Sequence, residues 1–309
     1  MEKLELVEKK FKALGTDIYL QIVCGGNLEE EAEKKLADLQ AFYFSVEHIF
    51  SRFDSGSELS YFNSSLGKFS KASPHFLAVA KKNLEYYALS DGLFDPRIIT
   101  VLEWIGYDKD FSQNRPKAKL EEAFPKEHFQ DLTADLVIDG DEILFNQRMD
   151  FAGIAKGYIT DTVWQMLQNG GFRNFLVDSG GDMFASGTDK KGEDWKVDIE
   201  GIPEEKILIK LRNEAIATSG IGRRKWESGE KRFHHLVNPK EPEKFNFDLQ
   251  SVTVVAPSVT EADFWAKVLF LKGKIEGKKF SSENKLKSIF LDYRGNAWIS
   301  GEMKKNLEL

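Results

Sequence analysis

Apolar residues that recur every three or four positions predict four helices along the chain. The expected helices span residues 28–53, 75–92, 156–171 and 260–273. The second ends at Asp91-Gly92 and the third at Gly170-Gly171, which are typical C-terminal signals. These segments alternate with stretches of a different period, so the chain is not an all-helical protein.

Short apolar runs and two-residue alternation predict strands between the helices. We expect strands or hairpins at 17–25, 134–147, 174–187, 195–202, 206–220, 250–258 and 286–300, and a capped turn at 55–63. The pattern shows no repeat and no linker rich in Pro, Gly or Ser. It predicts one α+β unit, or two lobes that share a cleft.

Composition is that of an ordinary globular protein, with 309 residues, 41% apolar and 30% charged, and a net charge of −7. Acids are interspersed among the basic residues, which excludes a nucleic-acid footprint. The single cysteine, Cys24, excludes an internal disulfide and a cysteine metal cluster. The sequence has no 18-residue apolar run and no apolar signal region near residue 1, so we expect no membrane span and a cytoplasmic protein, although removal of a leader would leave the same pattern.

Lys156 lies in the compact stretch DFAGIAKGYITD, among small and apolar residues. An unpaired buried charge is costly, so this lysine needs a partner. The expected partner is Asp150, Asp161 or the phosphate of a ligand.

Two further stretches place small or hydroxyl residues just after apolar strands. Gly180-Gly181-Asp182 would let a backbone approach a ligand closely, or would simply form a tight turn. Thr218, in AIATSG, suits phosphate or ring recognition, or an ordinary Ser/Thr turn. The spacings of the Rossmann and Walker motifs are absent.

Two pairs of polar residues are the remaining candidates for chemistry. His234 and His235 would point to opposite sides of a strand, so either could be structural while the other serves as an acid, base or stacking group. Asp263 and Lys267 are four positions apart on a predicted helix and share a face. They form either a plain ion pair or a pair that faces a ligand.

Eight motifs taken together resemble the ApbE family of FAD:protein FMN transferases. They are LGTDIYLQI, FSRFDSGSELSYFN, DGLFDPR, DFAGIAKGYITD, LVDSGGDMFASG, AIATSG, HHLVNP and SVTVVAPSVTEADFWAKVLFLKG, and their order covers residues 11–273. The resemblance implies a single α+β domain over 1–309 with a core at 11–295, mixed sheets with packed helices, and an FAD cleft between two intimate lobes. It also implies Mg²⁺, and an acceptor flavoprotein whose Thr or Ser receives FMN while AMP leaves.

The resemblance also implies roles for individual residues. Asp263 would be a catalytic carboxylate and metal ligand, together with the carbonyl of Gly153, and His235 and Lys267 would complete the catalytic group. The implied cofactor contacts are Leu14, Phe53, Leu93, Phe94, Asp95, Asp150, Lys156, Gly180, Gly181, Thr218 and Val237.

Three positions depart from the family pattern. Lys267 stands where a Thr or Ser completes the metal site, and an ammonium has no lone pair for Mg²⁺. Lys267 therefore either pairs with Asp263 and replaces the ion, or swings to solvent and leaves room for Mg²⁺ and a water. Phe53 replaces a stacking Tyr, and the segment 240–246 lacks the usual Thr-Gly.

Three functions follow from this resemblance and these departures. The first is FMN transfer from FAD to a protein hydroxyl. The second is FAD binding without turnover, which Lys267 would favour. The third is hydrolysis of FAD to FMN and AMP.

Overall fold

The computed structural model describes residues 4–109, 116–125, 131–202 and 207–308, and has the predicted α+β fold. The chain forms two compact units, each built from separate segments. Unit 1 consists of Met1–Ser45, Lys156–Ser219 and Asp248–Leu309, and unit 2 of Val46–Ala155 and Gly220–Phe247.

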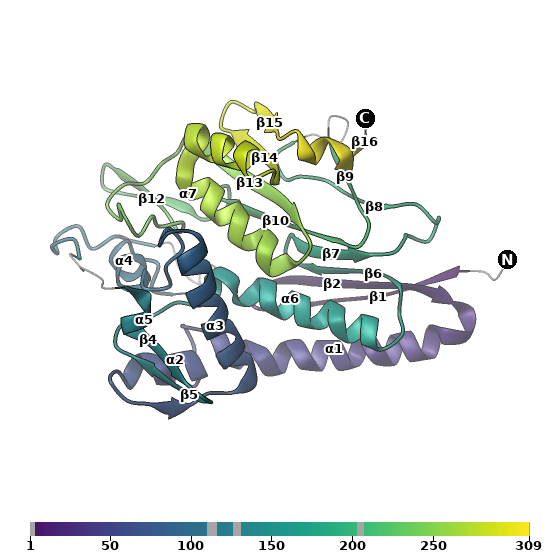
Figure 1. Cartoon of the computed structure of the whole chain (residues 1–309), viewed down its shortest axis with the longest axis horizontal. Coiled ribbons are helices and arrows are strands. Elements are labelled where there is room, and N and C mark those ends of the chain that lie inside the picture. Colours follow the sequence, from purple (N-terminus) through teal and green to yellow (C-terminus); the bar gives the residue numbers. More distant parts are fainter. Residues whose placement is uncertain (1–3, 110–115, 126–130, 203–206, 309) are drawn as a thin grey trace. The chain divides into compact units, whose positions relative to one another are not determined.

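Unit 1 is organised around an eight-stranded sheet (Figure 1). Its order is β1 (Leu4–Ala13), β2 (Thr16–Gly25), β6 (Asn174–Ser179), β7 (Asp182–Ser186), β10 (Glu214–Gly220), β13 (Leu249–Ala256), β14 (Lys287–Asp292) and β15 (Ala297–Ile299). Three helices pack on it, namely α1 (Glu29–Phe50), α6 (Ala152–Asn169) and α7 (Val259–Glu283), with a short 3₁₀ turn at Gly26–Leu28 before α1. One helix contact is the stacking of Trp164 from α6 on Phe184 from β7, with ring centroids 4.2 Å apart.

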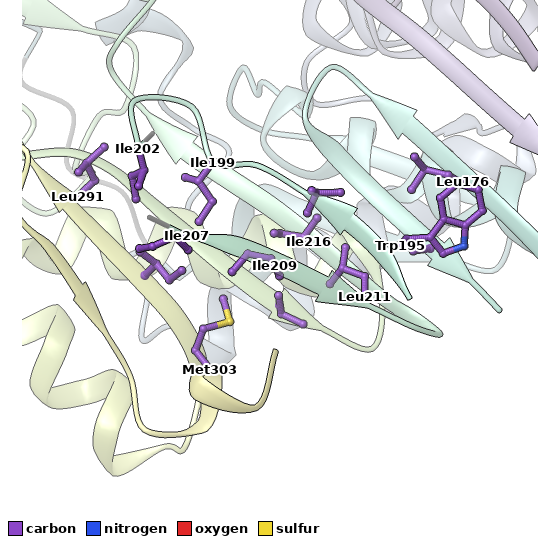
Figure 2. Packing of buried hydrophobic residues seen from close by; sticks show 14 of the residues in the cluster. Leu176, Trp195, Ile199, Ile202, Ile207, Ile209, Leu211, Ile216, Leu291 and Met303 are labelled. Atoms are coloured by element: carbon purple, nitrogen blue, oxygen red, sulfur yellow. The ribbon is translucent and has the colours of Figure 1, made fainter. Parts of the chain in front are cut away.

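A three-stranded sheet supplies a second layer of unit 1. It has the order β16 (Leu307–Glu308), β9 (Leu208–Leu211) and β8 (Trp195–Val197), and a 3₁₀ turn at Glu302–Asn306 leads into β16. Figure 2 shows the buried cluster in which Ile209 and Leu211 lie with Leu176 and Ile216 of the large sheet. The flanking β6 residues Phe175 and Val177 are also fully buried, as expected for a strand covered on both faces.

Helix α7 carries both a start signal and an interruption. The Ser258 side chain accepts a hydrogen bond from the backbone N–H of Glu261, so the Ser-x-x-Glu sequence caps the helix. At Gly273 the backbone turns to φ 77° and ψ 180°, a conformation that essentially only glycine adopts. The sequence prediction ended the helix at this residue, and the structure breaks the helix there, whereas the second helical segment of α7, which runs to Glu283, was not predicted.

Unit 2 is smaller and is held by two aromatic clusters. Its elements are α2 (Glu58–Ser64), α3 (Pro74–Leu89), α4 (Ile99–Trp104), α5 (Leu132–Asp135), the sheet β3 (Ser70–Lys71), β5 (Glu142–Phe145), β4 (Leu136–Asp139), and the hairpin β11 (Lys225–Ser228), β12 (Lys231–His234). Phe62 stacks on Phe76 at 4.7 Å in one cluster. Trp104 and Phe233 belong to the other.

Most predicted elements are confirmed, including the hairpins at 134–147 and 286–300. The expected capped turn at 55–63 is wrong, because Ser57 caps a true helix, α2, through the N–H of Ser60. Strand β1, helix α4 and the hairpin β11–β12 were not predicted. The structure also begins α6 at Ala152, one turn before Lys156.

Candidate functional site

Lys156 pairs with an acid that the sequence analysis did not consider. Its Nζ lies 2.5 Å from Asp182 Oδ2 and donates to the backbone oxygen of Ser179 at 3.1 Å. The expected partners Asp150 and Asp161 are therefore wrong as ion partners in this structure. Five positions along a helix correspond to roughly 140° of rotation, so Asp161 points away from Lys156. Asp161 instead accepts hydrogen bonds from the backbone N–H groups of Val259 and Thr260 at the start of α7.

Asp182 is positioned by a tight glycine turn between β6 and β7. Gly180 and Gly181 have φ angles of +68° and +94°, and a Cβ on Gly180 would lie 2.0 Å from Thr16 Oγ1. The tight-turn interpretation of these glycines is confirmed, while their contact with a ligand stays a prediction. The Gly181 N–H also donates to Asp178 Oδ1 at 2.7 Å, and burial raises the pKa of Asp178.

Asp263 and Lys267 face each other one turn apart on α7, as the four-residue spacing predicts. Lys267 Nζ lies 3.2 Å from Asp263 Oδ1, and the two side chains are 17% and 9% exposed. This is therefore a largely buried pair rather than a solvated surface bridge. Burial raises the pKa of Asp263; the positive charges of Lys267 and Lys156 oppose that rise, and the negative charge of Asp182 adds to it.

Lys156, Asp182, Asp263 and Lys267 thus form one group of interacting charges in unit 1, called here the four-charge cluster. Two carboxylates and two ammonium groups balance each other within it. Thr218 borders the cluster, because its backbone N–H approaches Asp182 Oδ1 at 3.4 Å and its hydroxyl bonds that of Thr253 at 2.9 Å.

Leu14 lies in the two-residue turn that joins β1 to β2. Leu14 and Gly15 have φ angles of 55° and 67°, which fit a type I′ hairpin turn, where Asn is far commoner than Leu. Strands β2 and β6 pair with Ile18 opposite Ser179, so this turn and the Gly180 turn lie at the same end of the sheet. A leucine held in the left-handed region is strained, and such strain often marks functional positions.

Unit 2 holds Asp150 and Phe53 around a residue that the sequence analysis missed, Arg52. Asp150 Oδ1 accepts from the backbone N–H of Ala152 at 2.8 Å, which caps α6, and Oδ2 lies 3.2 Å from Arg52 Nε. The guanidinium carbon of Arg52 lies 4.3 Å from the Phe53 ring centroid. The sequence held no signal for this arrangement, because an arginine beside a phenylalanine is unremarkable by itself.

The predicted strip Leu93, Phe94 and Asp95 follows α3 in unit 2. Leu93 and Phe94 are only 7% and 6% exposed, so both belong to the hydrophobic core. Asp95 pairs with Arg97 at 2.7 Å, and Arg97 also pairs with Asp135 at 2.5 Å. Asp95 is thereby fixed in a buried triad, and its contact with a nucleotide stays a prediction.

The two adjacent histidines have different surroundings. His234 is 2% exposed, its Nε2 lies 3.0 Å from the backbone oxygen of Asn246, and burial lowers its pKa to about 4. His235 is half-buried, with Nδ1 3.4 Å from the backbone oxygen of Arg224 and its ring edge-on to Tyr107. His234 is therefore the structural member, and a ligand contact of His235 stays a prediction. Val237 is buried.

Within residues 4–109, 116–125, 131–202 and 207–308, no three side chains of His, Cys, Asp or Glu are grouped so as to hold a metal ion. Gly153, the predicted backbone ligand, lies in the first turn of α6, and its role stays a prediction. Among the same residues, every helix is too short or too polar to cross a bilayer.

Known proteins similar to this chain are flavin transferases. The chain is 24% identical over 97% of its length to the FAD:protein FMN transferase of Haemophilus influenzae, of which the match covers 90%. It is 28% identical to that of Chlamydia pneumoniae, over 86% of each chain. The match to the Escherichia coli protein of the same name covers 52% of this chain and 47% of that protein.

Solved structures give the same fold. The flavin transferase ApbE from Vibrio cholerae superposes with a TM-score of 0.81 at 23% identity, over 98% of this chain and all of that one. The ApbE protein of Thermotoga maritima gives 0.82 at 20% identity, over 99% of this chain and all of that one. The sequence model of the ApbE family matches residues 14–290, so the chain belongs to the ApbE family.

Proposed function

We propose that this protein is an FAD:protein FMN transferase. In the reaction, the hydroxyl oxygen of a Thr or Ser on an acceptor protein bonds to the phosphorus of the FMN half of FAD. The bond between that phosphorus and the AMP phosphate oxygen breaks, AMP leaves, and the hydroxyl proton is released. Membership of the family and the similarity to the Haemophilus influenzae transferase along almost the whole chain support this proposal.

The four-charge cluster is the observation that carries the proposal. Transfer of a phosphoryl group depends mainly on positioning and on neutralising the charge of the phosphate oxygens. Lys156 is 29% exposed and its ammonium has three rotatable donors, so it can share a phosphate oxygen while it stays near Asp182. Asp263, whose pKa is raised by burial, is suited to take up the hydroxyl proton.

Mg²⁺, which the family implies, does not fit the residues as they are arranged here. Asp263 Oδ1 faces the ammonium of Lys267 at 3.2 Å, and an ammonium offers no lone pair to a metal. A divalent ion placed beside this ammonium would be repelled. We therefore propose that Lys267 supplies positive charge at this place and that transfer of FMN to the acceptor does not require a metal.

The same pair favours a second candidate function, which is binding of FAD without turnover. A lysine is a point charge and polarises a phosphate less specifically than a coordinated Mg²⁺. Flavin could then be held with its pyrophosphate intact. Nothing in the described residues specifically favours the third reading, an FAD pyrophosphatase. The identity of the acceptor protein and a cytoplasmic location stay predictions from the sequence.

The experiment compares the wild type with Lys267→Thr in the presence of Mg²⁺ and of EDTA. FAD is supplied with a peptide carrying a threonine acceptor, and AMP release and peptide mass are followed. We expect the wild type to modify the peptide equally with Mg²⁺ and EDTA. Lys267→Thr should become dependent on Mg²⁺, should turn over faster with it, and should bind Mn²⁺ more tightly in calorimetry.

A matched control is available on the same helix. Lys272 pairs with Glu276, which lies four residues later, at 3.4 Å. The substitution Lys272→Thr should change neither metal dependence nor turnover. FAD bound by the wild type with no AMP released would establish the second candidate instead. AMP without a modified peptide would indicate hydrolysis. Equal Mn²⁺ affinity for Lys267→Thr and wild type would show that Lys267 does not take the place of a metal.

A further inference from the structure

The Arg52 side chain lies against two aromatic rings in unit 2. Its guanidinium carbon is 4.3 Å from the ring centroid of Phe53 and 4.6 Å from that of Tyr107. The two rings are 6.0 Å apart and inclined at 61°, so they form a wedge around the guanidinium. Such contacts are attractive, because the face of an aromatic ring carries partial negative charge.

Polar contacts hold the same guanidinium in place. Nε lies 3.2 Å from Asp150 Oδ2, and Nη2 donates to the backbone oxygen of Tyr107 at 2.6 Å. The Arg52 and Asp150 side chains are only 6% and 7% exposed. A buried charge stays ionised at low cost only when it is paired and hydrogen-bonded, and both conditions are met here.

Phe53 is the exposed member of this group. Arg52 covers one face of its ring, yet the residue as a whole remains 41% exposed. A large aromatic side chain that is held by a guanidinium and is still partly exposed is suited to stack on a flat ligand ring. The Asp150 carboxylate contacts the same guanidinium and can accept hydrogen bonds from a ligand.

We infer that Arg52 is a positioning residue for the flavin ring of FAD, because it sets the Phe53 ring and the Asp150 carboxylate relative to each other. This inference rests on the proposed function. A flavin ring has a broad flat face for stacking. It also has an N–H group, between two carbonyl groups, that can donate a hydrogen bond to a carboxylate. Arg52 thereby couples a stacking contact to a hydrogen-bond contact.

The fork shape of the guanidinium is essential to this role. A lysine at position 52 could keep an ion pair with Asp150. It could not lie flat against Phe53 and Tyr107 while it also donates to the backbone. The substitution Arg52→Lys therefore separates charge from shape.

The test measures binding of FAD, FMN and AMP separately, by flavin fluorescence and calorimetry. For Arg52→Lys we expect about tenfold weaker binding of FAD and FMN, the equivalent of losing one desolvated cation–π contact, and unchanged binding of AMP. The absorption spectrum of bound FMN should shift toward that of FMN in water. The midpoint of thermal unfolding should stay near that of the wild type.

Arg148→Lys is the matched control. Arg148 makes a two-bond pair with Glu103 in the same unit, at 2.9 and 2.6 Å, so the substitution again exchanges a guanidinium that pairs with a carboxylate for an ammonium. This variant should bind FMN as the wild type does. The double variant Arg52→Met/Asp150→Asn removes both charges together, so it can be tested even if Arg52→Met alone fails to fold. It should bind FMN more weakly than Arg52→Lys does.

Three outcomes would overturn the inference. Wild-type affinity and spectrum for FMN in Arg52→Lys would show that shape at this position does not matter. An equal loss of AMP and FMN would indicate a general structural role. A wild-type protein that binds no FAD would contradict the proposed function and this inference together, whereas the first two outcomes leave the proposed function standing.

Discussion

The two units hold their cations in different ways. The four-charge cluster of unit 1 uses lysines, and the ammonium-bearing side chains of Lys156 and Lys267 remain 29% and 17% exposed. Unit 2 uses arginines, and the side chains of Arg97 and Arg52 are 1% and 6% exposed. An ammonium rotates and exchanges partners, whereas a guanidinium fixes the planar groups around it.

This difference separates two tasks that a nucleotide enzyme has to perform. A charge that must meet a phosphate during a reaction has to be exchangeable, and a charge that shapes a binding surface has to be fixed. Exchangeable pairs should contribute little to stability but much to ligand affinity. Complete removal of a fixed cation should cost more stability than removal of an exchangeable pair.

The largest effect is expected from removing a fixed cation. Arg97→Met would leave the buried carboxylates of Asp95 and Asp135 without their guanidinium, and such a loss typically costs about 3–5 kcal/mol in free energy of unfolding. Urea denaturation measures it directly. The triple variant Asp95→Asn/Arg97→Met/Asp135→Asn should recover much of the loss. A cost below about 1 kcal/mol would show that the triad is not fixed in the sense used here.

The second effect concerns His234, which stays neutral because it is buried in unit 2. Burial lowers the pKa of His234 to about 4 in the folded protein, against an ordinary value of 6.5, so the unfolded chain takes up the proton first. The stability that this histidine contributes is complete above pH 6.5 and is lost as pH falls toward 4. At full extent the loss is about 3 kcal/mol.

His234→Gln is the comparison for this pH dependence. Glutamine retains a side-chain donor for the backbone oxygen of Asn246 but does not titrate. Its free energy of unfolding, measured from pH 7 to pH 4, should fall less steeply than that of the wild type. Parallel curves for the two proteins would contradict the assignment of a buried neutral His234.

The smallest effect on stability is expected from removing an exchangeable pair as a unit. Lys156→Met/Asp182→Asn deletes both charges, so no buried carboxylate is left without its partner. We expect the free energy of unfolding to change by less than about 1 kcal/mol. FAD affinity should fall about tenfold, because a charge-assisted bond to a phosphate is lost. A large loss of stability with normal FAD affinity would reverse the comparison between the two units.

Sequence reasoning succeeded where the interacting residues are close along the chain. The contact of Asp263 with Lys267 follows from helical spacing alone, and the hairpin at 134–147 follows from Asp139-Gly140. One of the two adjacent histidines is buried, as predicted, although β12 ends at His234 and His235 lies just beyond the strand.

Contacts between distant segments could not be predicted in the same way. Lys156 meets Asp182 only because the turn at Gly180 brings β7 alongside β6, and nearer acids offered the more obvious partners. Arg52 depends on Tyr107 and Asp150, both of which lie far along the chain. Position in a single sequence does not encode such pairings, because they arise from the packing of whole elements.

The segmented order of unit 1 has a consequence for synthesis on the ribosome. Strands β1 and β2 emerge first, but β13 and the helix that carries Asp263 and Lys267 emerge only after residue 248, when all of unit 2 has been made. At about 5–20 residues per second, the unfinished sheet waits for many seconds with an open edge. A nascent chain therefore cannot assemble the four-charge cluster until α7 has been made.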